Sequence, residues 1–284
     1  MLDKISKQEK NIKEFMRGTS VEVTPGGARA IEDFSEILRP GTIVYVTFLP
    51  GSDFNATVET VSRLKREGFY PIPHFAARSI ESEKILEEGL ERLKEEADTT
   101  EVLLIGGGVD NPLGPFSASI EVLRTGLFDK YGFKKIGVAG HPEGSPDITP
   151  QECAQAIQEK NDFSCHTDAD LYLATQFLFE AEPLFKWEKA IRSQGNKLPI
   201  HVGIPGLATI PTLLRHARQC GVGPSVRFLK KNPIDLFKMS LSNTPLGKFI
   251  NAPSSNPSKL IFDIVSGLTL DSDCLINKCH LVIF

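Results

Sequence analysis

The sequence predicts a single-domain (β/α)8 barrel over residues 1–284, on three observations. Short apolar runs rich in Val, Ile and Phe recur eight times, and most precede a longer segment with helical spacing and charged faces. A two-domain organisation would favour a linker rich in Pro, Gly and Ser between the domains, and no such linker divides this chain. The rival doubly wound sheet needs a GxGxxG turn that opens a helix after the first strand, where only Gly26 and Gly27 follow Pro25.

The strand pattern is followed by helical segments in order along the chain. The predicted strands are 20–25, 43–48, 70–77, 101–107, 134–142, 171–179, 199–206 and 276–284. The clearest helices are 53–67 and 80–97, where acidic and basic residues alternate at three- and four-residue spacing. We therefore expect these two helices to lie on the solvated outside of the barrel.

The two ends of the chain depart from a regular barrel. An N-terminal helical extension is expected over 1–19. Residues 230–273 hold four prolines and a modest helical pattern, which indicates an elaborated βα unit rather than a second domain. The chain stops at the eighth predicted strand, so the last outer helix is missing: either something else covers that strand or the sequence is a truncated product.

Composition excludes several classes of protein. The formal net charge of -4 offers no basic surplus for a nucleic-acid backbone. Five cysteines without a CxxC pair favour reduced thiols in a cytoplasmic chain over a disulfide framework. We expect no membrane-spanning segment, because no stretch approaches the roughly 20 apolar residues that one requires. We expect no metal either, because HExxH spacing is lacking and His216 with Cys220 is an isolated pair.

The active site of such a barrel lies where the strands end, and polar residues stand at those positions. Glu22 alternates with two valines, so its carboxylate points into the barrel if the valines face the helices. Burial there would raise its pKa and make it a general acid, whereas an exposed or salt-bridged glutamate is the plain alternative. Gln176 is similar, because a buried amide needs either a ligand or a hydrogen bond in the core.

Histidines and glycines complete the predicted mouth of the barrel. His74 and His141 suit ligand binding, proton transfer or a structural role. Three consecutive glycines at 106–108 let the backbone approach a flat or phosphorylated ligand closely, although a tight mobile turn explains them too.

These strings together resemble a known family. They are VEVTP, VTF, PIPHFAAR, GGVDNPLGPF, VAGHPEGSPD, ATQFLF and VGIPGLATIPTLL, in this order over about 20–232. The chain resembles the methylenetetrahydrofolate reductase family, which are flavin-binding (β/α)8 barrels, and most of all a bacterial branch with AGHPEG and CGVG motifs. The resemblance implies FAD-dependent reduction of 5,10-methylenetetrahydrofolate to 5-methyltetrahydrofolate by NAD(P)H, in one-carbon metabolism and methionine biosynthesis. It implies a small-molecule folate substrate and a possible homo-oligomer.

The resemblance also implies roles for single residues. Glu22 matches the acid that protonates N10 of the folate, and Gln176 matches the glutamine that contacts the pterin. Asp110 would serve the substrate if its loop presents it. Lys160 resembles a basic residue that reaches toward the phosphates of the cofactor. The other positions matched to the flavin site are Thr47, His74, Gly107, Gly108, Ala118, Ser119, His141 and Glu143.

Three positions depart from the family pattern. Gly107 and Gly108 stand where a glycine and an aspartate are usual, so either the loop shifts to present Asp110 or that carboxylate is absent. Ser145 replaces a histidine, and Leu213 stands near the place of an aromatic residue that stacks on the substrate. The alternative function is therefore a flavin-poor barrel that binds folate or transfers one-carbon units without reducing them. A structural subunit of a larger complex is a third, non-enzymatic possibility.

Overall fold

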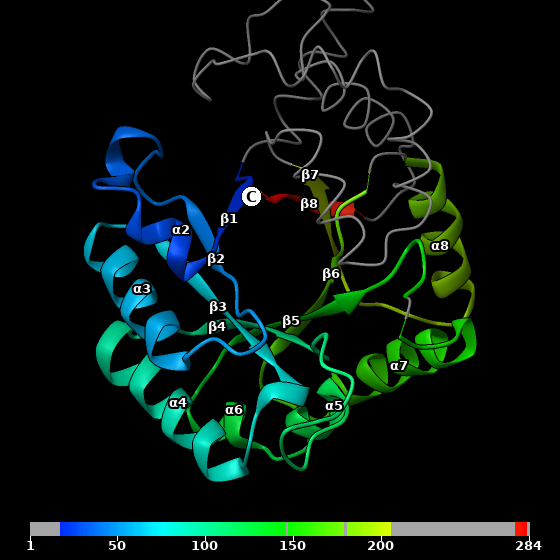
Figure 1. The fold of residues 1–284 in the computed structure, drawn as a ribbon. Helices are drawn as coiled ribbons and strands as arrows, with labels where there is room; N and C mark the ends of the chain where they lie inside the picture. The colour runs from blue at the N-terminus through cyan, green and yellow to red at the C-terminus, as the bar shows by residue number, and fades with distance from the viewer. Residues whose placement is uncertain (1–17, 146, 179–180, 206–275, 283–284) are drawn as a thin grey trace, which may run out of the picture.

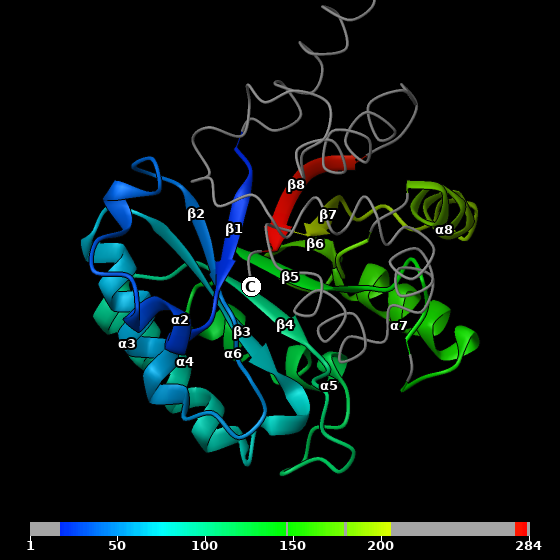
Figure 2. The ribbon, with the colours of Figure 1, turned by 45° about the horizontal axis from the view of Figure 1, so that its top comes forward.

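The protein forms a closed barrel of eight parallel strands in the order of the chain (Figure 1). The computed structural model describes residues 18–145, 147–178, 181–205 and 276–282. The strands are β1 Ser20–Val23, β2 Ile43–Val46, β3 Tyr70–Ala76, β4 Glu101–Ile105, β5 Lys135–Gly140, β6 Asp170–Thr175, β7 Ile200–Pro205 and β8 Ile276–Val282. Strand β8 pairs with both β7 and β1, which closes the ring (Figure 2). The predicted (β/α)8 fold and all eight predicted strands are confirmed.

Helices surround the ring of strands on the outside (Figure 1). They are α2 Pro25–Arg29, α3 Phe54–Arg66, α4 Glu83–Ala97, α5 Ser119–Leu123, α6 Leu127–Lys130, α7 Pro150–Phe163 and α8 Ala181–Ser193, with short 3-10 turns η1 Phe34–Glu36 and η2 Ala77–Ser79. The two helices that the sequence predicted most clearly are α3 and α4. Each begins where a capping side chain accepts a backbone N–H: Asp53 from Asn55, and Ser82 from Ile85.

Four features named from the sequence fall wholly or mostly on residues outside the described ranges. The N-terminal extension over 1–19 lies outside them except for its last two residues. The elaborated segment over 230–273 also lies outside them. The same holds for Leu213 and for the pair His216 and Cys220.

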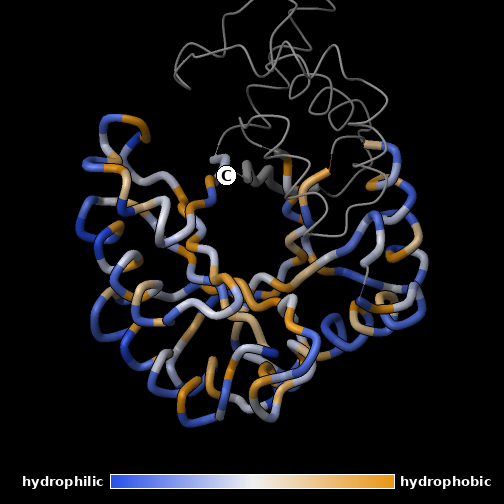
Figure 3. The backbone as a smooth tube through the Cα atoms, viewed as in Figure 1, coloured by the Kyte–Doolittle hydropathy of each residue, from blue (hydrophilic) through white to orange (hydrophobic). Residues whose placement is uncertain are grey.

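The main apolar core lies between the strands and the outer helices. Valines of β2 and β4 and leucines of α3 and α4 are buried in this layer, whereas the outer sides of these helices carry hydrophilic residues (Figure 3). Helices α3 and α4 approach closely at Gly89, where a Cβ atom would lie 2.8 Å from the ring of Phe54. Burial of one face of each helix in this way leaves the inside of the barrel for a separate set of side chains.

A smaller cluster fills the inside of the barrel. Tyr45, Ile72 and Leu103 form this interior cluster, and Tyr172 reaches it from β6. Strand β5 carries Gly137 opposite Tyr172, where an added Cβ would lie 2.6 Å from the phenol ring. The interior cluster is thus a packed floor, and the polar ends of the strands lie above it.

Candidate active site

Three side chains from the first three strands meet at the mouth of the barrel. Glu22 is the register partner of Tyr45, so both side chains face the interior. The hydroxyl of Thr47 donates to Glu22 Oε1 at 3.0 Å, and His74 Nε2 lies 4.0 Å from Glu22 Oε2. The side chains of Glu22 and His74 are 17% and 5% exposed. The structure therefore places Glu22 inside the barrel, with one oxygen already held by a neighbouring strand.

A second group of polar residues stands across the mouth, after β5 and β6. A pocket there is lined by His141, Pro142, Glu143, Gly144, Gln176, Phe177 and Leu178. The side-chain oxygen of Gln176 accepts the backbone N–H of Phe177 at 3.0 Å, and the backbone N–H of Gln176 donates to the carbonyl of Gly140 at 3.3 Å. In this structure the side-chain oxygen of Gln176 is thus bonded to the backbone of the next residue.

Two basic residues lie beside this pocket, of which Lys160 is buried and His141 half-buried. Lys160 in α7 is 5% exposed, and its amine donates to the carbonyl of Ala139 at 3.2 Å. Burial lowers the pKa of Lys160 to about 8. Burial, and then the positive charge of Lys160, lower the pKa of His141 to about 4, so His141 is neutral near pH 7. Lys160 was expected to reach toward cofactor phosphates, but its amine is directed to the end of β5.

The glycine loop after β4 is attached to the segment after β3 by Arg78. The backbone N–H of Arg78 donates to Gly106, and its side chain donates to the carbonyls of Val109 and Ser117 at 3.4 and 3.0 Å. Its carbonyl accepts the N–H of Leu113 at 2.8 Å. One arginine therefore bonds at both ends of the loop and in its middle.

Glycines allow the loop after β4 to lie close to the segment after β3. Gly107 has φ +94°, and a Cβ there would lie 3.1 Å from Cβ of Ala76. At Gly114 an added Cβ would lie 2.3 Å from the carbonyl oxygens of Ile80 and Glu81, so only glycine fits without a shift of the backbone. Among the described residues other than the chain neighbours, no atom stands within 4 Å of a Cβ built at Gly106 or Gly108.

The remaining predicted residues lie on this loop and at its end. Asp110 is exposed on it, Ala118 is half-buried at the start of α5, and Ser119 is buried in the first turn of that helix. Glu121 accepts the N–H groups of Ser117 and Ala118 and so fixes the end of the loop. Among the side chains in the described ranges, no three of His, Cys, Asp and Glu gather as metal ligands would.

Comparison with known proteins places the chain in a family. A model of the methylenetetrahydrofolate reductase family matches residues 30–231. The chain belongs to the methylenetetrahydrofolate reductase family. A stretch of 104 residues is 31% identical to methylenetetrahydrofolate reductase 1 of Schizosaccharomyces pombe. That match covers 36% of this chain and 16% of the relative, so the chain spans a small part of the relative's length.

Solved structures offer a more distant likeness to this reductase-family chain. Deoxyribose phosphate aldolase from Aeropyrum pernix is 12% identical with a TM-score of 0.42, covering 80% of this chain and 97% of that one. A protein from Burkholderia cenocepacia, described as a lyase or mutase, is 11% identical with a TM-score of 0.43, covering 88% and 99%. Likeness at this level adds nothing to the fold, which the strand pairing already shows.

In the described part of the chain, no helix has the length and apolar character needed to cross a bilayer.

Sequence reasoning missed three residues of this family member's site. Arg78 stands inside the string PIPHFAAR, but nothing in the string reveals its carbonyl partners beyond β4. Tyr45 and Tyr172 lie under the mouth with their hydroxyl oxygens 2.8 Å apart. Both belong to apolar strand runs, and a tyrosine at an interior position of a strand was the feature that could have revealed them.

Proposed function

We propose that this chain reduces 5,10-methylenetetrahydrofolate to 5-methyltetrahydrofolate, with hydride from NAD(P)H carried by FAD. Membership of the family over residues 30–231 supports this reaction. The observation that carries it is a carboxyl group held inside the mouth of the barrel between Thr47 and His74. An acid at the end of a barrel strand is where a substrate nitrogen can receive a proton as the folate ring opens.

Glu22 is the general acid of this proposal. Because Thr47 donates to Oε1, that oxygen acts as an acceptor, and the transferable proton resides on Oε2. Oε2 is also the oxygen that faces His74. Thr47 thus orients the carboxyl group, and proton transfer from Oε2 to N10 of the folate would contribute roughly 10²–10⁴-fold to the rate.

The flat ring of a flavin is proposed to lie against the glycine loop. Gly106 and Gly108 support this, because no described residue other than their chain neighbours stands within 4 Å of a Cβ at either position, so the backbone there is open to close approach. Gly107, Ala118, Ser119, His141 and Glu143 would complete the binding site. FAD, when bound, supplies hydride transfer, and the barrel supplies position and electrostatics.

Gln176 is the proposed substrate contact at the opposite side of the mouth. A folate pterin would bond to its side-chain amide, whose oxygen accepts the backbone N–H of Phe177 in this structure. Its bond to the N–H of Phe177 is local and worth about 1 kcal/mol, so a ligand that offers an equivalent bond can replace it. Asp110, exposed on the glycine loop, is the proposed second contact with the substrate.

A flavin-poor folate-binding or one-carbon-transferring barrel is the second candidate. Two observations favour it. Gly108 stands where a carboxylate is usual in the family, and Lys160 bonds to the carbonyl of Ala139 rather than facing open space. Folate could still reach Glu22 and Gln176 in such a protein.

The decisive experiment joins a spectrum with one substitution. Purified protein is expected to show the visible absorption of FAD, or to gain it on reconstitution. Glu22→Gln should keep the flavin and its reduction by NAD(P)H, while reoxidation by methylenetetrahydrofolate slows roughly 10²–10⁴-fold. Glu96→Gln, on the outer face of α4, is the matched control and should behave as wild type.

Two results would contradict this proposal. A colourless protein that cannot be reconstituted, yet binds tetrahydrofolate tightly in calorimetry, would favour the second candidate. Unchanged folate reduction in Glu22→Gln would remove Glu22 as the acid. The single-domain organisation, a cytoplasmic location, a role in methionine biosynthesis and a homo-oligomer belong to the same proposal.

A further inference from the structure

We propose that Tyr45 and Tyr172 are positioning residues that hold His74, and through it Glu22, in place from below. The kinetic part of this inference rests on the proposed function, whereas the structural part does not. Both tyrosines are 2% exposed, and their hydroxyl oxygens lie 2.8 Å apart inside the barrel. A buried hydroxyl pair of this kind connects the two rings, because neither hydroxyl has water to bond to instead.

One hydroxyl of the pair donates and the other accepts, so a single hydrogen bond joins β2 to β6 across the inside of the barrel. Burial raises the pKa of both phenols, and the neighbouring Glu101 raises them further. Lys135 pairs with that carboxylate, with its amine 3.7 Å from Glu101. Both tyrosines therefore keep their protons, and the bond between them is between two neutral hydroxyls.

The ring of Tyr172 makes three further contacts. His201 stacks on it, with centroids 4.0 Å apart and planes at 26°. Strand β5 leaves room for it at Gly137, where a Cβ would lie 2.6 Å from Cζ and 2.7 Å from the hydroxyl oxygen of Tyr172. The amine of Lys135 lies 5.6 Å from the centroid of the same ring. The phenol of Tyr172 is therefore a fixed anchor for the hydroxyl of Tyr45.

Tyr45 connects the anchored Tyr172 to the side chains at the mouth of the barrel. Its ring meets His74 edge to face, with centroids 5.7 Å apart and planes at 70°. His74 is 4% exposed, and its Nε2 lies 4.0 Å from Glu22 Oε2. Tyr45 is also the register partner of Glu22 on the neighbouring strand. Loss of either hydroxyl releases the Tyr45 ring, and the imidazole that rests on it then loses its fixed distance to the acid.

The test uses Tyr45→Phe, Tyr172→Phe and the double variant, with Tyr131→Phe as the matched control. Tyr131 loses a comparable hydroxyl, which contacts Glu87 on the outside of the barrel. In the unliganded protein, the imidazole ¹⁵N signals of His74, assigned from their loss in His74→Gln, are expected to shift in both single variants and not in the control. Gly137→Ala, which crowds Tyr172 and keeps both hydroxyls, should move the same signals.

Kinetics give the second readout. Each single variant should lower kcat for folate reduction on the order of tenfold with KM and flavin absorbance unchanged, because a small misplacement of a catalytic group is costly. The double variant should lose less than the two single losses combined, since the first substitution already breaks the shared bond. Unchanged His74 signals in both single variants, or equal shifts in Tyr131→Phe, would overturn the inference. A wild-type protein that fails to reduce folate would overturn the proposed function alone, and the His74 signals would still decide the role of the tyrosines.

Discussion

The two sides of the barrel mouth satisfy their polar groups in different ways. On the side of β1 to β3, Glu22, Thr47 and His74 come from three strands and contact one another. On the side of β5 and β6, Gln176 bonds to the next residue of its own chain, and Lys160 bonds to a carbonyl of β5. The first side is therefore formed before a ligand arrives. On the second side, the side-chain oxygen of Gln176 and the amine of Lys160 instead bond to the backbone.

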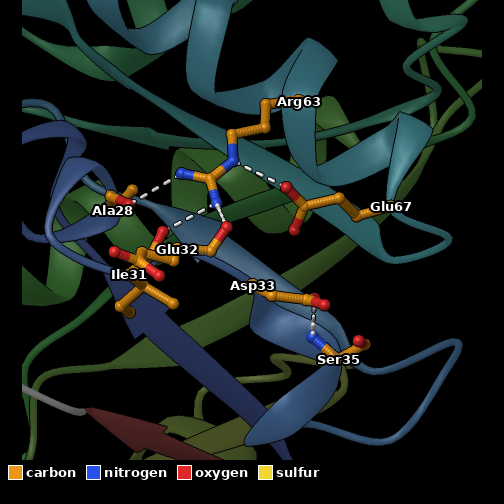
Figure 4. A network of polar contacts seen from close by, with 7 residues as sticks. All are labelled: Ala28, Ile31, Glu32, Asp33, Ser35, Arg63 and Glu67. Carbon is orange, nitrogen blue, oxygen red and sulfur yellow. Dashed lines mark hydrogen bonds and ion pairs between the residues drawn. The ribbon is translucent and has the colours of Figure 1, made fainter.

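The largest expected effect tests how firmly the first side is fixed. Arg63 of α3 binds the connection after β1, where its guanidinium donates to the carbonyls of Ala28, Ile31 and Glu32 and to the carboxylate of Glu67 (Figure 4). Arg63→Met leaves three carbonyls without this partner, and we expect a loss of about 4 kcal/mol in the free energy of unfolding.

Urea denaturation followed by circular dichroism measures this loss. Arg92→Met is the matched control, because Arg92 pairs with Glu96 on the surface of α4 and should cost less than about 1 kcal/mol. Equal losses in the two variants would show that the connection after β1 is not held by Arg63.

The second prediction concerns how stability depends on pH between 8 and 10.5, through Lys160 on the other side of the mouth. The pKa of Lys160 falls from its usual 10.5 to about 8 in the folded chain, so between these values the unfolded chain binds more protons and stability rises with pH. We expect this group to contribute about 3 kcal/mol that is present above pH 10.5 and lost as the pH falls through 8.

Lys160→Met should remove that part of the pH dependence. Its stability relative to wild type is expected to be highest near pH 7 and to decline toward pH 10.5, in urea denaturation at several pH values. Lys84→Met, at an exposed position of α4, should follow the wild-type curve throughout. A parallel curve for Lys160→Met would mean that the amine is not desolvated.

The third prediction loosens the glycine loop on the first side. Arg78→Met removes two side-chain hydrogen bonds to the carbonyls of Val109 and Ser117, at an expected cost of about 2 kcal/mol. Hydrogen exchange should accelerate in peptides from 106–117 and stay unchanged in β1. Arg66→Met, exposed at the end of α3, is the control. Protection of the loop in Arg78→Met would show that the glycine contacts alone hold it.

The smallest effect on stability is expected at Gln176. Gln176→Ala removes one local hydrogen bond and should cost less than about 1 kcal/mol, while KM for the folate rises on the order of tenfold. Gln155→Ala on the surface of α7 should leave both values unchanged. A large loss of stability with an unchanged KM would make Gln176 a core residue rather than a substrate contact.

The sequence predicts the strands and the direction of Glu22 well because both depend on local alternation of apolar and polar residues. It cannot reveal contacts between residues that are far apart in the chain, such as Tyr45 and Tyr172 at a separation of 127 residues. It also cannot show that the amine of Lys160 turns back to the carbonyl of Ala139, because helical position alone does not fix a side-chain partner; its contact with cofactor phosphates stays a prediction. Arg78 is missed for the same reason, because its partners are backbone atoms and carry no residue-specific pattern.

The close approach at Gly114 has a consequence for how molecules enter and leave. The backbone there lies against the carbonyls of Ile80 and Glu81, and Arg78 of the segment after β3 donates to two carbonyls of the loop after β4, so the two loops are held together. We therefore expect these two loops to move as one rigid unit. Under the proposed function, a folate or nicotinamide would then enter and leave past the ends of β5 and β6, where the side-chain oxygen of Gln176 can exchange the N–H of Phe177 for a ligand.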